Sequence, residues 1–268
     1  MKQILLTVLL SVPFISYPFT HIYAADSAAD LKHARTVSGT QIKPGTIVKF
    51  GRYFNSAENT GAQAAVSSKS SSNSSSGKAE KEPIEWKVLE TEPDGTLLLA
   101  SVYSIDGRVF NEKRSGGTWE KSSIRKWLNN EFLQQAFNER ERKAISATRL
   151  KNSRLFLFFS KAQPDTEDSV FLLSVEEVKK YFRTTERTAP ATGYAAEHLC
   201  RNLFGDGGRW WLRTSGFMPG RVCYVDTDGL VFFAGGPVNE GGGCVRPAIR
   251  INPSGLNISG TPDYSTMK

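Results

Sequence analysis

The fold of this chain is decided between residues 210 and 251, which read WWLRTSGFMPGRVCYVDTDGLVFFAGGPVNEGGGCVRPAIRI. Runs of β-branched and aromatic residues alternate there with glycine, and residues 205–244 hold 11 of the 23 glycines. These runs predict short strands over 210–214, 222–225, 230–233 and 245–251. Asp228-Gly229 tolerates positive φ and predicts a hairpin turn between the second and third strands. Because Pro247 has no backbone N–H, we expect the last strand to lie at a sheet edge or to carry a bulge.

Strand patterns also occur well before this region. A turn at Pro44-Gly45 introduces a predicted strand that ends at Tyr53, and residues 84–89 alternate between apolar and polar. A turn at residues 93–95 then leads into a more buried strand over 96–103. The last two strands should form a hairpin.

Helical patterns fill the middle of the chain. Apolar residues spaced for one face of a helix lie at Ile124, Trp127, Leu128 and Phe132. We expect Asn129 and its neighbour to break or recap that helix. Asn138 and Ser174 each stand three residues before a glutamate, the spacing of a capping box, and predict further short helices. Strands, then helices, then strands predict an α+β domain with short antiparallel sheets, two to four short helices and a glycine-rich loop region.

The amino terminus has the pattern of a secretory signal peptide. Lys2 precedes an apolar run from Ile4 to Val12, and small residues follow at Ala24 and Ala25. An apolar run of that length is too short to span the hydrocarbon core of a bilayer. We therefore expect cleavage after residue 24 or 25, with an uncleaved anchor as the alternative, and no membrane span in the mature chain.

The remaining organisation follows from composition. Eight of the ten residues from Ser67 to Ser76 are serine, too polar to offset the entropy lost on ordering. We expect a disordered serine-rich insertion between paired strands. The predicted organisation is a signal peptide over 1–24, a polar tail over 25–41, one α+β domain over 42–253 with the insertion at 55–81, and a carboxy-terminal tail over 254–268.

The scarcity of histidine and cysteine limits the chemistry. The chain has 34 Lys and Arg against 27 Asp and Glu, a net charge of +7, which becomes +6 when Lys2 leaves with the signal peptide. Its three histidines include His21 in that segment, so His33 and His198 remain. Catalytic triads need a positioned base, and zinc sites need several nitrogen or sulfur ligands. We expect no enzyme activity, no cofactor and no metal site.

Six separated motifs occur in a fixed order along the chain. They are FGRY at 50–53, PIEW at 83–86, Trp119 with LN at 128–129, VFLLS at 170–174, WWLR at 210–213 and VRPAI at 245–249. In this order they resemble the bacterial domain-of-unknown-function family 6273, over residues 42–252. The carboxy-terminal portion also resembles C-type lectin-like domains. The resemblance implies a lectin-like architecture and a surface or secreted setting, without an assigned reaction; the calcium-binding tripeptides of sugar-binding C-type lectins have no counterpart.

Arginine and aromatic residues gather on the predicted strands after residue 209. Because Trp210 and Trp211 are adjacent, they face opposite sides of a strand, so one should be buried and the other could stack on a ligand. The ligand-binding candidates are Trp211, Arg213, Arg221, Tyr224 and Arg246. The alternative interpretation is that these arginines are solvated at strand ends or form structural ion pairs.

Three cysteines in an exported chain allow one disulfide and one free thiol. Cys223 lies on the predicted hairpin and Cys244 begins the closing strand. We therefore predict a Cys223–Cys244 disulfide, which would tie the glycine-rich loop together and leave Cys200 free.

These observations predict an exported, non-catalytic binding module of the cell envelope or extracellular space, either periplasmic or extracellular. It would recognise a glycan, an anionic polymer or a protein through its glycine-rich loops, and no nucleic acid. Residues 120–154 carry nine Lys and Arg against four Glu, which suits an anionic partner or simply a solvated helix face. Two alternatives remain: an enzyme of the formylglycine-generating type on a lectin-like fold, and a structural envelope protein.

Overall fold

Antiparallel sheets form the framework of the protein. A computed structural model describes residues 42–55, 80–114, 118–152, 163–198, 200, 208–254, 256, 258 and 260–262. All of these lie in one unit, Lys32–Lys268. The predicted signal peptide, the polar tail, residues 56–79 of the serine-rich insertion and most of the carboxy-terminal tail lie outside the described residues.

The described strands form a six-stranded sheet in the order β13-β1-β2-β3-β12-β7, with antiparallel pairs throughout. Its strands are β1 Thr46–Phe54, β2 Lys81–Thr91, β3 Leu97–Ser101, β7 Val170–Leu172, β12 Pro247–Ile251 and β13 Gly260–Pro262. Phe54 pairs with Lys81, so the serine-rich insertion joins two neighbouring strands, as predicted. All five residues of β3 are buried, which confirms the more buried strand expected there.

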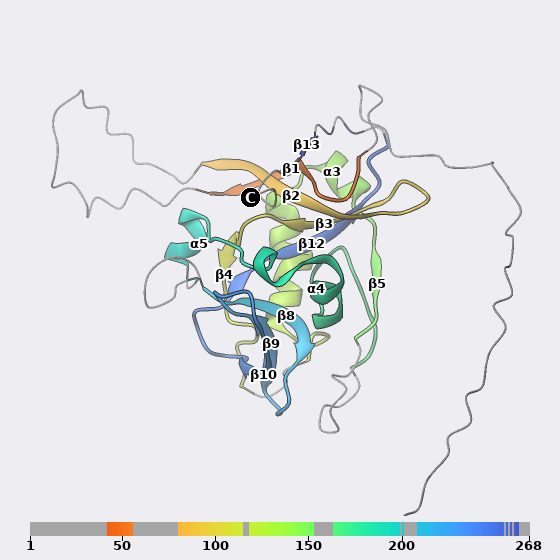
Figure 1. Ribbon diagram of the computed structural model, residues 1–268. Helices are drawn as coiled ribbons and strands as arrows, with labels where there is room; N and C mark the ends of the chain where they lie inside the picture. Colours follow the sequence, from red (N-terminus) through yellow and green to blue (C-terminus); the bar gives the residue numbers. More distant parts are fainter. Residues whose placement is uncertain are drawn as a thin grey trace, which may run out of the picture. The chain divides into compact units, whose positions relative to one another are not determined.

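A five-stranded sheet has the order β10-β9-β8-β11-β4 and lies below β1, β2, β3 and β12 in Figure 1. Its strands are β4 Asp106–Gly107, β8 Trp210–Ser215, β9 Arg221–Val225, β10 Val231–Pro237 and β11 Cys244–Val245. The β8–β11 pair is parallel, and the other pairs are antiparallel. Val225 pairs with Val231 across Asp228-Gly229, which confirms the predicted hairpin. A short ribbon pairs β5 Thr148–Leu150 with β6 Thr166–Asp168.

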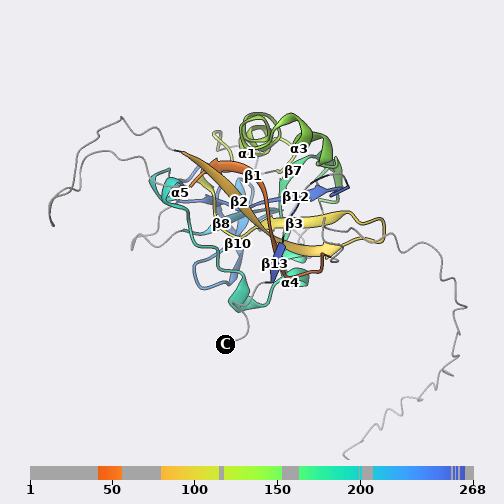
Figure 2. The same ribbon diagram turned by 90° about the horizontal axis from the view of Figure 1, so that it is seen from above.

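Short helices flank the sheets. They are α1 Ser123–Trp127, the π-helical turn η1 Leu128–Phe132, α2 Leu133–Ala136, α3 Glu139–Ala144, α4 Val175–Tyr181, the 3-10 turn η2 Thr184–Glu186 and α5 Gly193–Glu197. Figure 2 shows α1 and α3 on one side of β2 and β3, with α4 on the other. The capping boxes at Asn138 and Ser174 are both formed. These features confirm the α+β class with antiparallel sheets and short helices.

Two local expectations differ from the structure. The π-helical turn η1 interrupts the α-helix at Asn129, as expected, but the helix does not end there: Asn129 donates to the carbonyl of Val170 at 2.8 Å and accepts from the backbone N–H groups of Ser169 and Val170. These bonds to the start of β7 let the helix continue to Ala136. Pro247 does not lie on an edge strand, since β12 is enclosed by β3 and β7. It is the first residue of β12, where the chain passes from one sheet to the other after β11.

Candidate functional site

The tryptophan pair on β8 is entirely internal. Trp210 and Trp211 are 1% and 0% exposed, so the expectation that one of them offers a stacking surface was wrong. Their indole N–H groups donate to the carbonyls of Arg187 at 2.9 Å and Arg108 at 2.8 Å, respectively. β8 is enclosed by β9 and β11, and both of its faces pack against other parts of the protein.

Two of the candidate arginines are also buried. Arg213 forms an ion pair with Glu177 and donates to the carbonyl of Leu172 at 3.0 Å. Arg246 donates to the carbonyl of Ser101 at 2.9 Å, and its guanidinium carbon lies 5.0 Å from the Trp210 ring centroid. Burial lowers the pKa of Arg246 to about 10, so it keeps its charge at neutral pH. Both side chains hold the two sheets and α4 together.

Of the other two candidates, Tyr224 is buried and Arg221 lies nearer the surface. Arg221 is half-buried and donates to the carbonyl of Gly235 at 2.8 Å. Tyr224 stacks on Phe232 at 5.0 Å, and Arg209 lies between the Tyr224 and Trp211 rings. The structure thus brings Trp211 and Tyr224 together around Arg209, while the remaining candidates point elsewhere. Trp211 has no exposed ring face for a ligand, and the binding role of the other four residues stays a prediction.

The predicted disulfide was wrong. Cys200 is bonded to Cys244, with their Cα atoms 4.7 Å apart, and Cys223 carries the free thiol. β8 lies between β9, which holds Cys223, and β11, which begins with Cys244, so those two cysteines are not neighbours. Cys223 is buried and lies within hydrogen-bond range of the Ser215 carbonyl at 3.4 Å. Burial raises the pKa of its thiol to about 12.

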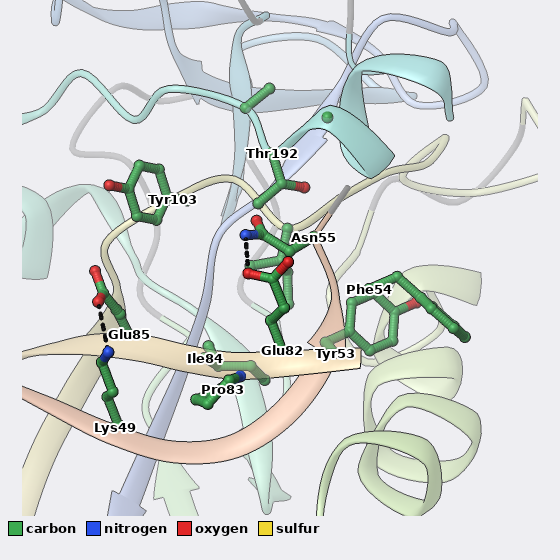
Figure 3. Close-up of a pocket in the computed structure, with 13 residues that line it drawn as sticks. Lys49, Tyr53, Phe54, Asn55, Glu82, Pro83, Ile84, Glu85, Tyr103 and Thr192 are labelled. Atoms are coloured by element: carbon green, nitrogen blue, oxygen red, sulfur yellow. Dashed lines mark hydrogen bonds and ion pairs between the residues drawn. The ribbon is translucent and has the colours of Figure 1, made fainter. Parts of the chain in front are cut away.

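A cavity of about 500 Å³ lies where the end of β1, the start of β2, the loop after β3 and the start of α5 meet (Figure 3). Side chains in its wall include Tyr53, Phe54, Asn55, Glu82, Glu85 and Tyr103, and we call it the Tyr103 cavity. Tyr103 lies two residues beyond the end of β3 and is 40% exposed, and its backbone carbonyl accepts the Ser101 hydroxyl at 2.7 Å. Its ring is therefore available while its backbone is fixed.

Polar groups face the Tyr103 ring across this cavity. The Asn55 amide donates to Glu82 at 2.7 Å, and Figure 3 shows this pair on the side of the cavity away from Tyr103. Glu85 lies below Tyr103 and pairs with Lys49 at 3.5 Å. Two carboxylates against one ammonium give these lining groups a net charge of −1. The sequence reasoning missed this cavity, because its wall comes from four separate segments.

A second cavity, of about 560 Å³, lies between β4, α1, η1 and the end of α5. Its wall includes Asp106, Arg108, Lys126, Trp127, Glu131 and His198, and we call it the Arg108 cavity. Tyr53 lines the first cavity, and its hydroxyl donates at 2.9 Å to Asp106, which lines the second. One buried hydrogen bond therefore links the walls of the two cavities.

Asp106 is 1% exposed and anchors this second cavity. Its carboxylate also accepts the backbone N–H of Gly107 at 2.8 Å and Nε of Arg108 at 3.3 Å. Burial raises the pKa of Asp106, and the positive charge of Arg108 and the hydrogen bond from Tyr53 oppose that rise. Burial, together with the neighbouring Asp106, also raises the pKa of Tyr53, which therefore stays protonated as a donor.

The disulfide supports the wall of the Arg108 cavity. Cys244 pairs with Gly107 in the β4–β11 ladder, so the bridge ties β4 to the chain that follows α5. A Cβ at Gly107 would lie 1.5 Å from the carbonyl oxygen of His198, so this contact requires glycine. The His198 ring stacks on Tyr194 at 3.9 Å.

The described part of the chain contains no group of three or more His, Cys, Asp or Glu side chains that could hold a metal ion. It also contains no helix with the length and apolar character needed to cross a membrane.

Comparison with known proteins places the chain in a family. The model of the family "Domain of unknown function (DUF6273)" matches residues 94–253, more than half of the 268 residues, from the turn before β3 to just beyond β12. No curated protein and no solved structure matches the chain. The match begins later than the expected resemblance, which extended back to residue 42 and so included β1 and β2. The chain belongs to the domain of unknown function family DUF6273.

Proposed function

We propose that the protein is an exported, non-catalytic binding module and that its Tyr103 cavity binds a sugar residue of a glycan. The observation that carries this proposal is the exposed ring of Tyr103, which faces the hydrogen-bonded pair of Asn55 and Glu82 across a cavity of about 500 Å³. An aromatic ring packs on the C–H face of a sugar, and carboxylate and amide oxygens accept its hydroxyl protons.

The size and charge of this cavity distinguish between the three classes of ligand expected from the sequence: a glycan, an anionic polymer and a protein. Its volume lies in the range of small-molecule sites, roughly 300–1,000 Å³, and is too small for a folded protein surface. The two carboxylates of Glu82 and Glu85 exceed the single charge of Lys49, so an anionic polymer would be repelled. A neutral ligand rich in hydroxyl groups meets neither objection.

Export is supported by two features. The amino-terminal segment has the pattern of a signal peptide, and the Cys200–Cys244 disulfide suits an oxidising compartment outside the cytosol. A C-type lectin-like fold and a place in the cell envelope remain part of the proposal on the strength of the sequence motifs.

A cysteine-dependent enzyme of the formylglycine-generating type gains no support from the thiols. Two of the three cysteines are joined in the disulfide, and burial raises the pKa of Cys223, which keeps that thiol protonated. A purely structural envelope role leaves the Tyr103 cavity without a purpose.

A glycan array tests the proposal with the wild-type protein, Tyr103→Ala and Phe232→Ala. Phe232 is the matched control, since it is 44% exposed and lies on β10, outside the cavity. We expect Tyr103→Ala to weaken glycan binding by about 1 kcal/mol, close to fivefold, and Phe232→Ala to leave it unchanged.

Two results would overturn this assignment: no glycan retained by the wild-type protein, or equal binding by the wild type and Tyr103→Ala. Glu82→Gln gives an independent check, because it keeps the side-chain size but removes a negative charge. We expect it to alter the pattern of glycans bound rather than the fold, as judged by an unchanged circular dichroism spectrum.

A further inference from the structure

We propose that the Arg108 cavity is a second binding site and that it takes a zwitterionic ligand, a free amino acid or the end of a short peptide, with the ligand carboxylate on Arg108. This inference does not rest on glycan binding, and its test contains no glycan. Three properties of the cavity lead to it: a fixed guanidinium, two carboxylates without partners among the described residues, and a volume that suits a small ligand.

The guanidinium of Arg108 is held from two directions. Its Nε pairs with Asp106 at 3.3 Å, and its central carbon lies 3.9 Å from the Trp127 ring centroid. Asp106 is itself fixed by the hydroxyl of Tyr53 and the N–H of Gly107. Such a preorganised group loses little conformational entropy when it binds.

The outer edge of this guanidinium is open. No group in the described part of the chain hydrogen-bonds to its two terminal nitrogens, and the Arg108 side chain is 39% exposed within the cavity wall. Two parallel N–H donors match the two oxygens of a carboxylate. Arg108 is therefore placed to bind a carboxylate in bidentate fashion.

The other charges favour a ligand that also carries an amine. Glu112 and Glu131 line the same cavity and are exposed, and neither carboxylate has a partner within the described ranges. With Asp106 they make three negative charges against the two of Arg108 and Lys126. A doubly charged phosphate would be repelled by this surplus, whereas an ammonium group would pair with it. A cavity of about 560 Å³ accommodates a dipeptide.

Isothermal titration of the full chain with the dipeptide alanyl-alanine tests the proposal. We compare the wild type with Arg108→Gln and with Arg149→Gln as matched control, since the Arg149 side chain is 80% exposed and pairs with Asp165 outside the cavity. We expect Arg108→Gln to bind about tenfold more weakly or worse, and Arg149→Gln to bind as the wild type does. No heat of binding with the wild type at millimolar dipeptide, or equal affinity in Arg108→Gln, would overturn the proposal.

The role of the acidic rim has a separate test that also serves if Arg108→Gln does not fold. The double variant Glu112→Gln/Glu131→Gln changes exposed groups only, and we expect it to weaken alanyl-alanine binding severalfold. N-acetyl-alanyl-alanine, which lacks the ammonium, should bind the wild type more weakly than alanyl-alanine and should not lose affinity in the double variant. Equal affinity of both peptides for the wild type, or tighter binding of inorganic phosphate than of the dipeptide, contradicts a zwitterion site.

Discussion

Loss of the Cys200–Cys244 disulfide is expected to lower the free energy of unfolding by about 4 kcal/mol. The two cysteines are 44 residues apart in sequence. In the chain-entropy model, closing a loop of that length removes about 13 cal/mol/K from the unfolded chain, which corresponds to about 4 kcal/mol near room temperature. This is larger than the roughly 3 kcal/mol expected for the shorter loop between Cys223 and Cys244, so the correct pairing also changes the predicted magnitude.

The assay is urea unfolding followed by circular dichroism, with the variant Cys200→Ala/Cys244→Ala. Alanine avoids leaving a buried hydroxyl at either position, since both cysteines are 0% exposed. Cys223→Ala is the matched control, because it removes an equally buried sulfur without breaking a covalent bond. We expect the control to lose only about 1 kcal/mol, the usual cost of a small change in the core.

The pairing itself can be read by mass spectrometry of the non-reduced protein. No Lys or Arg lies between Cys223 and Cys244, so trypsin leaves both on one peptide, whereas a protease that cuts after Glu240 separates them. We expect the Cys244 peptide to be linked to the Cys200 peptide. A link to Cys223, or a double variant no less stable than Cys223→Ala, would refute the reasoning.

Three further outcomes follow from buried groups. Burial raises the folded-state pKa of Asp106 above its unfolded value near 3.8. Its contribution to stability is therefore fully present below that value and is lost as the pH rises through the folded pKa. Asp106→Asn should remove this dependence of the free energy of unfolding on pH, as measured by urea unfolding in a pH series. Arg213→Met should cost about 3 kcal/mol in the same assay, because it removes the buried positive charge that pairs with Glu177 and leaves that carboxylate with only the Ser174 backbone N–H among the described residues. Cys223, with its pKa raised to about 12, should resist a thiol reagent in the native protein and react as one thiol per chain in denaturant.

The features that sequence predicted well are those that depend on neighbours along the chain. The capping boxes at Asn138 and Ser174 depend on residues three positions apart, and the hairpin at Asp228-Gly229 depends on two turn residues between short strands. The family resemblance was also confirmed, because the order of motifs is a property of the sequence itself.

The features that sequence missed depend on sheet order. Adjacent tryptophans do face opposite sides of β8, but alternation cannot reveal that both faces are covered. Cys223 was paired with Cys244 because one lies on the predicted hairpin and the other begins the closing strand, yet the order β9-β8-β11 places another strand between them. Arg213 and Arg246 looked like surface groups until their internal acceptors, the carbonyls of Leu172 and Ser101, were known.

The sequence by itself determined the α+β class, the local caps and turns, the family, and the shortage of histidine and cysteine. The tertiary structure decided which cysteines pair and which candidates are internal, and it assembled the Tyr103 and Arg108 cavities. The physical reason is range: caps and turns arise from interactions across a few residues, whereas cavities and disulfides require segments from distant parts of the chain to meet. Tyr53 and Asp106 illustrate this, since 53 residues separate two side chains that share one hydrogen bond.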